Sequence, residues 1–269
     1  MTTSSIRMPE GLDALGLLLD RVAERQREDF GQLDSEAKAD GSLITACDRW
    51  SDAALVDGLA QLYPGEGVLS EEGSQCVPHS EAFWVVDPLD GTTNFAAGIP
   101  YWAISLARFE NGVPVLAVLD VPPLRQRIVA IRGGGAWRKH NKLQPPTARN
   151  QVAGCASLCS RSIGVLQKLP NQRFPGKIRL LGVASLNLVS VAMGQTVSAL
   201  EATPKIWDLA AAWLVLHELD CPIRWLSRDP GALQPGEDLA QADFPVLAAR
   251  DQATLATFSP WAEALVSRL

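Results

Sequence analysis

The stretch Trp84 to Phe95, WVVDPLDGTTNF, places two carboxylates three residues apart, where an apolar run ends and a polar turn begins. The apolar start of the stretch predicts a short buried strand. Pro88 is expected to end the regular structure, and Gly91 permits a backbone geometry that residues with a Cβ resist. We therefore expect Asp87 and Asp90 to leave the end of a strand together.

Two ionised carboxylates held this close repel each other unless a divalent cation neutralises both. Oxygen ligands favour magnesium or manganese. The polar run that follows, 91–94, is predicted to open a helix, whose free N–H groups and positive dipole end attract phosphate. The Thr92 hydroxyl is then placed to orient a water molecule. The segment predicts phosphate-ester hydrolysis, although Asp, Pro and Gly are also common in ordinary turns.

Three further acidic residues could complete such a site. Glu71 follows a short apolar run, and its alternative role is that of a solvated loop acid. Asp208 is predicted to be the N-cap of a helix over 208–219. Asp48 lies just before a helical stretch, and it too could simply be a cap.

Taken together, in their order and spacing, these segments resemble the inositol monophosphatase family, within the superfamily of lithium-sensitive, magnesium-dependent phosphatases. The resemblance covers roughly residues 10 to 220 and is carried by WVVDPLDGTTNF and by Trp207-Asp208 at the start of a helix. It implies a mixed α/β (α+β) fold, a layered α-β-α-β-α sandwich of the inositol monophosphatase and fructose-1,6-bisphosphatase type. It also implies Mg²⁺ as cofactor, two or three ions per site, with Mn²⁺ as the alternative.

The resemblance assigns roles residue by residue. Asp48 would hydrogen-bond Thr92, whose hydroxyl would activate the attacking water together with the metal held by Glu71. The first metal would use Glu71, Asp87 and a backbone carbonyl, and the second would use three aspartates. The implied metal ligands are all oxygen donors: Glu71, Asp87, the backbone carbonyl of Leu89, Asp90 and Asp208.

The implied substrate contacts combine backbone N–H groups for the phosphate with side chains around the leaving group. Val183 stands where the family usually has a hydroxyl residue. Glu201 matches a carboxylate that contacts sugar hydroxyls in inositol phosphatases, which favours a polyol phosphate. The implied contacts are Asp90, Gly91, Thr92, Gly182, Val183, Ala184, Glu201 and Asp208.

The function favoured by these residues is a magnesium-dependent phosphomonoesterase that hydrolyses a small polyol phosphate, inositol 1-phosphate above all. Histidinol phosphate is an alternative substrate, because its cationic leaving group suits an acidic pocket. Fructose 1,6-bisphosphate and 3′-phosphoadenosine 5′-phosphate fit less well, since family members that use them tend to carry longer insertions or added basic residues. A regulatory protein on a phosphatase fold that has lost its activity is the non-enzymatic alternative.

The composition is that of a globular protein: 269 residues, 47% hydrophobic and 20% charged. A net charge of −6 argues against nucleic-acid binding. No apolar run approaches the length of a membrane span, and the polar first residues lack a secretory leader, so we expect a cytoplasmic protein. The five cysteines, odd in number, predict reduced thiols. The resemblance also allows a homodimer, as in many relatives.

Periodicity and turn residues predict a subdomain boundary near residue 150. The N-terminal α+β subdomain, 1–150, would carry most metal ligands, and the C-terminal α/β subdomain, 151–269, would carry the substrate wall and the last ligand. A polar loop is predicted over 31–41. The other predicted elements are helices at 9–30, 184–193 and 208–219, strands at 102–109, 113–121, 128–131 and 197–201, and a last helix capped by Ser259, with Pro260 in its first turn and Leu269 on its apolar face.

Overall fold

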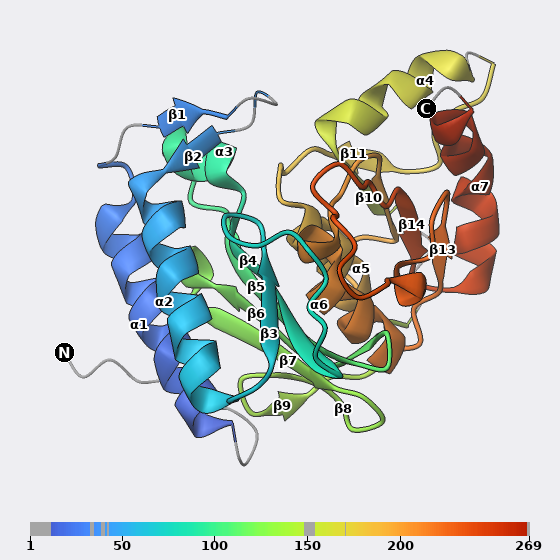
Figure 1. The fold of residues 1–269 in the computed structure, drawn as a ribbon. Coiled ribbons are helices and arrows are strands. Elements are labelled where there is room, and N and C mark those ends of the chain that lie inside the picture. The colour runs from blue at the N-terminus through green and yellow to red at the C-terminus, as the bar shows by residue number, and fades with distance from the viewer. Residues whose placement is uncertain are drawn as a thin grey trace.

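The computed structural model describes residues 12–32, 35–38, 41, 43–147, 154–169 and 171–267. Within that part of the chain, helices and sheets alternate in five layers (Figure 1). The predicted α-β-α-β-α sandwich is confirmed. The predicted boundary near residue 150 falls in 148–153, outside the described residues, and the division into subdomains stays a prediction.

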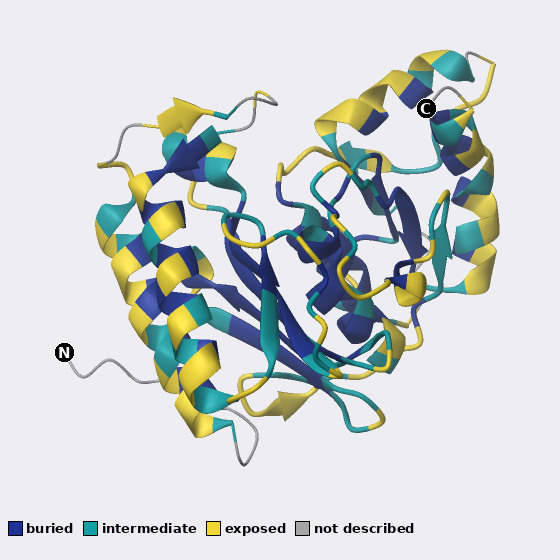
Figure 2. Cartoon of the chain, viewed as in Figure 1, coloured by how far each residue is buried: buried dark blue, intermediate teal, exposed yellow. Residues whose placement is uncertain are grey.

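The first layer consists of α1 (Asp13–Asp29) and α2 (Ala46–Leu62), which pack side by side. Leu15, Leu19 and Leu55 share a core with Trp84, which faces these helices from the first sheet. The opposite faces of both helices are exposed, as expected for surface helices with one apolar stripe (Figure 2). The predicted helix at 9–30 is confirmed for 13–29, while residues 9–11 lie outside the described part.

The second layer is a seven-stranded sheet in the order β3-β4-β5-β6-β7-β8-β9. β3 and β4 are parallel and the other neighbours are antiparallel. Asn111 and Gly112 join β5 to β6 with positive φ angles of 50° and 77°, which confirms the predicted hairpin turn. The strands are β3 (Gly67–Ser70), β4 (Ala82–Asp90), β5 (Ala103–Glu110), β6 (Val113–Val121), β7 (Gln126–Ile131), β8 (Gly135–Arg138) and β9 (Asn141–Lys142).

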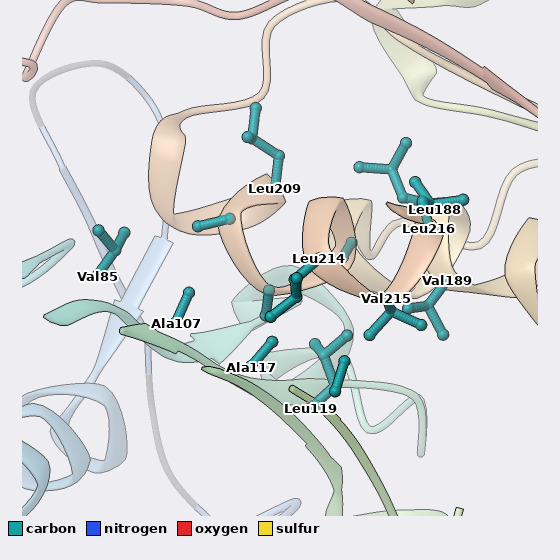
Figure 3. Packing of buried hydrophobic residues seen from close by; sticks show 14 of the residues in the cluster. Val85, Ala107, Ala117, Leu119, Leu188, Val189, Leu209, Leu214, Val215 and Leu216 are labelled. Atoms are coloured by element: carbon teal, nitrogen blue, oxygen red, sulfur yellow. The ribbon is translucent and has the colours of Figure 1, made fainter. Parts of the chain in front are cut away.

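The third layer holds α5 (Ala184–Ala192) and α6 (Ile206–Glu218) between the two sheets. Both helices are apolar on nearly every side, because neither has a face left for solvent. Figure 3 shows Ala107 and Ala117 of the first sheet packed below Leu214 of α6.

The fourth layer is a mixed five-stranded sheet in the order β11-β10-β12-β14-β13. Its outer face is covered by α7 (Gln252–Val266) and α4 (Val165–Lys168), with Phe258 and Trp261 in the shared core. The strands are β10 (Cys155–Leu158), β11 (Lys177–Arg179), β12 (Ser198–Glu201), β13 (Ile223–Trp225) and β14 (Val246–Ala249).

The remaining elements are short. β1 (Ser35–Ala37) and β2 (Leu43–Thr45) form an antiparallel pair ahead of α2, so part of the predicted loop over 31–41 is a strand. α3 (Thr92–Ala96) follows β4 directly. Three 3₁₀ turns complete the described elements: η1 (Pro122–Leu124), η2 (Ser160–Gly164) and η3 (Pro230–Ala232).

Two predicted boundaries are wrong, and both involve proline. Pro88 does not end its strand, because β4 continues to Asp90 through a bulge that places one extra residue between Asp87 and Asp90. Pro260 lies inside α7 rather than in its first turn, since Asp251 caps that helix by accepting a hydrogen bond from the Thr254 N–H at 2.7 Å. Leu269 lies outside the described residues.

All five cysteines are free, as their number predicts. In the described part of the chain, no helix has the length and apolar character needed to cross a membrane.

Candidate metal centre and active site

Three aspartates from two layers meet at the ends of β4 and α6. Asp87 follows Val85 by two residues, so strand alternation turns it toward the α6 side of the sheet. The bulge then brings Asp90 to the same space. Asp208, in the first turn of α6, faces them, and one carboxylate oxygen from each aspartate lies within 4.8 Å of the others.

The sequence predicts Asp208 as the N-cap of its helix, and this prediction is wrong. Asp208 is the third residue of α6, and Lys205 is the N-cap. Asp208 Oδ2 accepts a hydrogen bond from the backbone N–H of Lys205 at 2.8 Å, which is one of the two hydrogen bonds of a capping box. The same hydrogen bond recurs on α2, where Asp48 Oδ2 accepts from the backbone N–H of Thr45 at 2.8 Å, and there the Thr45 hydroxyl completes the capping box. In each case one carboxylate oxygen fixes the helix start and the other remains for the site.

Burial disfavours the charged forms of these aspartates. It raises the pKa of Asp90 to about 6, against hydrogen bonds from the N–H groups of Ser185 at 2.7 Å and Ala184 at 3.4 Å. Burial, reinforced by the neighbouring carboxylates, raises the pKa of Asp87 and of Asp208 well above the usual value. A cation among them would remove the repulsion.

The donor set fits a divalent cation. Asp87 Oδ1 accepts from the Leu89 N–H at 2.9 Å, whereas its buried Oδ2 has no hydrogen-bond partner among the described residues. A buried carboxylate oxygen without a partner is costly, and metal coordination would satisfy it. Every ligand atom offered is an oxygen, the donor that Mg²⁺ and Ca²⁺ prefer.

Glu71 lies beside Asp87 because β3 and β4 run parallel with Ser70 opposite Val86. The Glu71 N–H continues the ladder to the Val86 carbonyl at 3.2 Å. Burial raises the pKa of Glu71, and the Lys38 ammonium, 3.0 Å from its Oε1, opposes the rise. Sequence reasoning missed Lys38, whose partner is 33 residues away in the chain.

The predicted pairing of Asp48 with Thr92 is present in the geometry. The Thr92 hydroxyl lies 2.7 Å from Asp48 Oδ1 and 3.1 Å from the Leu89 carbonyl. A threonine hydroxyl has one proton, and donating it in a hydrogen bond to the Asp48 carboxylate leaves the Oγ1 lone pairs able to accept a hydrogen bond from a water molecule. Gly91 precedes α3 with a φ of 105°, a conformation that glycine adopts without strain.

The predicted substrate wall lies opposite. Asn94 of α3 donates to the carbonyls of Tyr101 at 2.9 Å and Leu181 at 2.8 Å, which holds the segment from Gly182 to Ala184 against the site. Val183 is completely buried, and a Cβ added to Gly91 would lie 2.8 Å from its Cγ2. Its side chain therefore packs under Gly91 rather than facing the site, and its role in substrate binding stays a prediction.

Glu201 ends β12 and is 2% exposed. Asn187 of α5 donates to its Oε1 at 2.9 Å, a contact that no local sequence pattern predicts. Burial raises the pKa of Glu201 to about 8, with a smaller contribution from the negative charge of Asp90.

A sequence model described as the inositol monophosphatase family matches residues 12–255. The chain belongs to this family. The family assignment and the site together make the protein a metal-dependent phosphoric monoester hydrolase.

Members of the inositol monophosphatase family with different substrates resemble the chain about equally. A histidinol-phosphatase of Mycobacterium tuberculosis is 34% identical over 215 residues, covering 75% of this chain and 82% of that protein. An inositol-1-monophosphatase of Mesorhizobium japonicum is 33% identical over 208 residues, covering 71% and 76%. The structure of an inositol monophosphatase from Thermotoga maritima superposes with a TM-score of 0.79 over 94% of this chain and 98% of that one, at 24% identity. The fold is that of the family.

Proposed function

We propose that this protein is a Mg²⁺-dependent phosphomonoesterase of small polyol phosphates, with inositol 1-phosphate as the favoured substrate. The observation that carries the proposal is the meeting of Asp87, Asp90 and Asp208 with the Thr92–Asp48 hydrogen bond at one end of β4. Glu71, Asp87 and the Leu89 carbonyl would hold a first ion, and the three aspartates a second. Bound divalent ions supply charge neutralisation and lower the pKa of water.

The residues of the chain orient the attacking water, bind the phosphate and contact the leaving group. Thr92 orients the attacking water, since its own proton is donated to Asp48. The backbone N–H groups of Gly91 and Thr92 hold the phosphate at the start of α3. Glu201, oriented by Asn187, accepts hydrogen bonds from hydroxyl groups of the leaving alcohol.

Histidinol phosphate is the second candidate. The observation that favours it is the acidic, buried Glu201 near Asp90, which would also suit a leaving group with an ammonium. The histidinol-phosphatase of M. tuberculosis has a similar sequence, which supports the same candidate.

The experiment is phosphate release from inositol 1-phosphate, histidinol phosphate, fructose 1,6-bisphosphate and 3′-phosphoadenosine 5′-phosphate, each with Mg²⁺ and with EDTA. We expect one preferred, Mg²⁺-dependent substrate, and inhibition by lithium at fixed Mg²⁺. Release that persists unchanged in EDTA would contradict the metal-dependent mechanism.

The variant Glu201→Gln separates the two candidates. For inositol 1-phosphate, the amide oxygen still accepts a hydrogen bond, so we expect a loss of kcat/KM of about tenfold or less. For histidinol phosphate, the ammonium of the bound substrate would favour the ionised form of Glu201, and the amide cannot supply that charge, so KM should rise much more. Equal losses of kcat/KM for both substrates would show that Glu201 does not distinguish between the two leaving groups.

A further inference from the structure

Lys38 directly follows β1 and points its ammonium into the metal centre. Its Nζ lies 3.0 Å from Glu71 Oε1 and 2.5 Å from Glu72 Oε1, and its side chain is 23% exposed. One ammonium is thus shared between two neighbouring carboxylates, of which Glu71 is the proposed ligand of the first metal.

A third carboxylate, that of Asp52, borders the turn that carries Glu71 and Glu72, because a Cβ added to Gly73 would lie 3.2 Å from Asp52 Oδ2. Asp52 is on α2, one helical turn after Asp48, and its buried Oδ1 has no hydrogen-bond partner within the described ranges. Burial raises the pKa of Asp52, and the positive charge of Lys38 partly offsets the rise. This side of the centre therefore holds more negative charge than one lysine can neutralise.

The ammonium and a divalent cation cannot both sit on Glu71 without cost, because two positive charges a few ångströms apart repel. A lysine side chain can readily move away from Glu71 when a cation binds there. Its charge is carried on a flexible four-carbon stem with three rotatable donors, and Glu72 keeps it paired after Glu71 is released.

We infer that Lys38 is the resident counter-ion of Glu71, and that it yields Glu71 to the incoming divalent cation while remaining bound to Glu72. Lys38 is then a positioning residue that lowers the metal affinity of the centre. The inference rests on the proposed function, since it assigns Glu71 to the first metal.

Titration calorimetry of Mn²⁺ into the metal-free full-length protein tests the inference. We expect Lys38→Met to bind Mn²⁺ about tenfold more tightly than the wild type, because no ion pair has to be broken. The matched control is Arg49→Met, which removes a positive charge that pairs with Glu36 on the same strand pair and does not contact Glu71. The affinity of this control should stay within about twofold.

A double-mutant cycle distinguishes displacement from simple repulsion. In the wild-type background, Glu72→Gln removes the carboxylate that retains the released ammonium, so Mn²⁺ should bind more weakly. In the Lys38→Met background the same change should have little effect. Equal effects in both backgrounds would mean that Lys38 acts through space, and would overturn the displacement.

The outcomes also separate the inference from the proposed function. A wild-type protein that neither binds Mn²⁺ nor releases phosphate in its presence would contradict both. Tight binding by the wild type with no gain in Lys38→Met would overturn the role of Lys38 alone. Lys38→Gln, whose polar side chain suits the half-buried position, provides the same comparison if the methionine variant does not fold.

Discussion

Asp87, Asp90 and Asp208 hold negative charge where burial and mutual repulsion disfavour it. The unfavourable free energy of this charge is offset only when a cation binds, so the individual carboxylates should matter far more to catalysis than to folding. The predictions at the residue scale follow from this asymmetry.

Asp90→Asn should reduce hydrolysis by about three orders of magnitude or more, because the second proposed metal loses a charged ligand. In EDTA its melting temperature should equal or exceed that of the wild type, since one of three repelling carboxylates is gone. Phosphate release measures the loss of hydrolysis, and thermal unfolding in EDTA measures the melting temperature. Asp57→Asn, on the exposed face of α2, is the control and should behave as the wild type. Retained turnover in Asp90→Asn would contradict the second metal site.

Thr92→Val keeps the shape of the side chain and removes its hydroxyl. If that hydroxyl orients the water, kcat should fall about 100-fold or more, with KM little changed. Thr92→Ser restores the hydroxyl 2.7 Å from Asp48 and should recover most of the rate. A valine variant as fast as the wild type would remove Thr92 from the mechanism.

At the scale of elements, the turn from β4 into α3 depends on one glycine. Gly91→Ala combines a φ of 105° with a Cβ 2.8 Å from Val183 Cγ2. We expect a loss of about 2 to 4 kcal/mol in the free energy of unfolding, measured in urea. Gly98→Ala is the matched control, because it has a φ of 75° with no atom within 4 Å and should cost about 1 kcal/mol. Adding Val183→Ala should recover the part of the stability loss that comes from the clash with Val183 Cγ2. If nothing is recovered, the whole loss comes from the strained backbone conformation at residue 91.

A buried ion pair ties α1 to the first sheet. Arg127 of β7, 1% exposed, donates to Asp120 of β6 and to Asp20 of α1, the latter at 2.8 Å. Asp120→Asn leaves a buried guanidinium short of its main partner and should cost about 3 to 5 kcal/mol in chemical unfolding. Asp20 is 30% exposed, so Asp20→Asn should cost less than about 1 kcal/mol. Similar costs for the two variants would show that the pair with Asp120 is not the stronger one.

The element pattern was largely predictable from the sequence, and so was the meeting of Asp87, Asp90 and Asp208 at the end of β4. Apolar runs and the Asn111-Gly112 turn are local signals, and they predicted strands and the hairpin correctly. The boundaries predicted from Pro88 and Pro260 were wrong for different reasons. At Pro88 a β-bulge lets the strand continue, and at Pro260 the helix has already been started by Asp251, nine residues earlier. The contact of Lys38 with Glu71 could not be predicted, because it depends on how the β1–β2 pair packs against α2 and α3.

At the scale of the whole molecule, the proposed metal centre would join the first sheet to the middle helices, since Asp87 and Asp90 come from β4 and Asp208 from α6. Mg²⁺ should therefore raise the melting temperature of the entire protein, with a stabilisation of about 2.7 kcal/mol at 100 times the dissociation constant. Asp208→Asn should show a much smaller Mg²⁺-dependent shift, whereas Asp57→Asn should match the wild type. Melting temperatures that do not respond to Mg²⁺ would contradict a centre shared between the layers.

The position of α5 and α6 between two sheets also determines when the protein can fold during its synthesis. The first sheet is complete at Lys142, but the helices that cover its inner face end only at Glu218. A ribosome adds residues at about 5 to 20 per second, so the apolar inner face waits roughly 4 to 15 seconds for its cover. During that interval the nascent chain presents to the cell the surface that Figure 3 shows packed against α6. We expect it to be a substrate for chaperones until α6 has emerged from the ribosome.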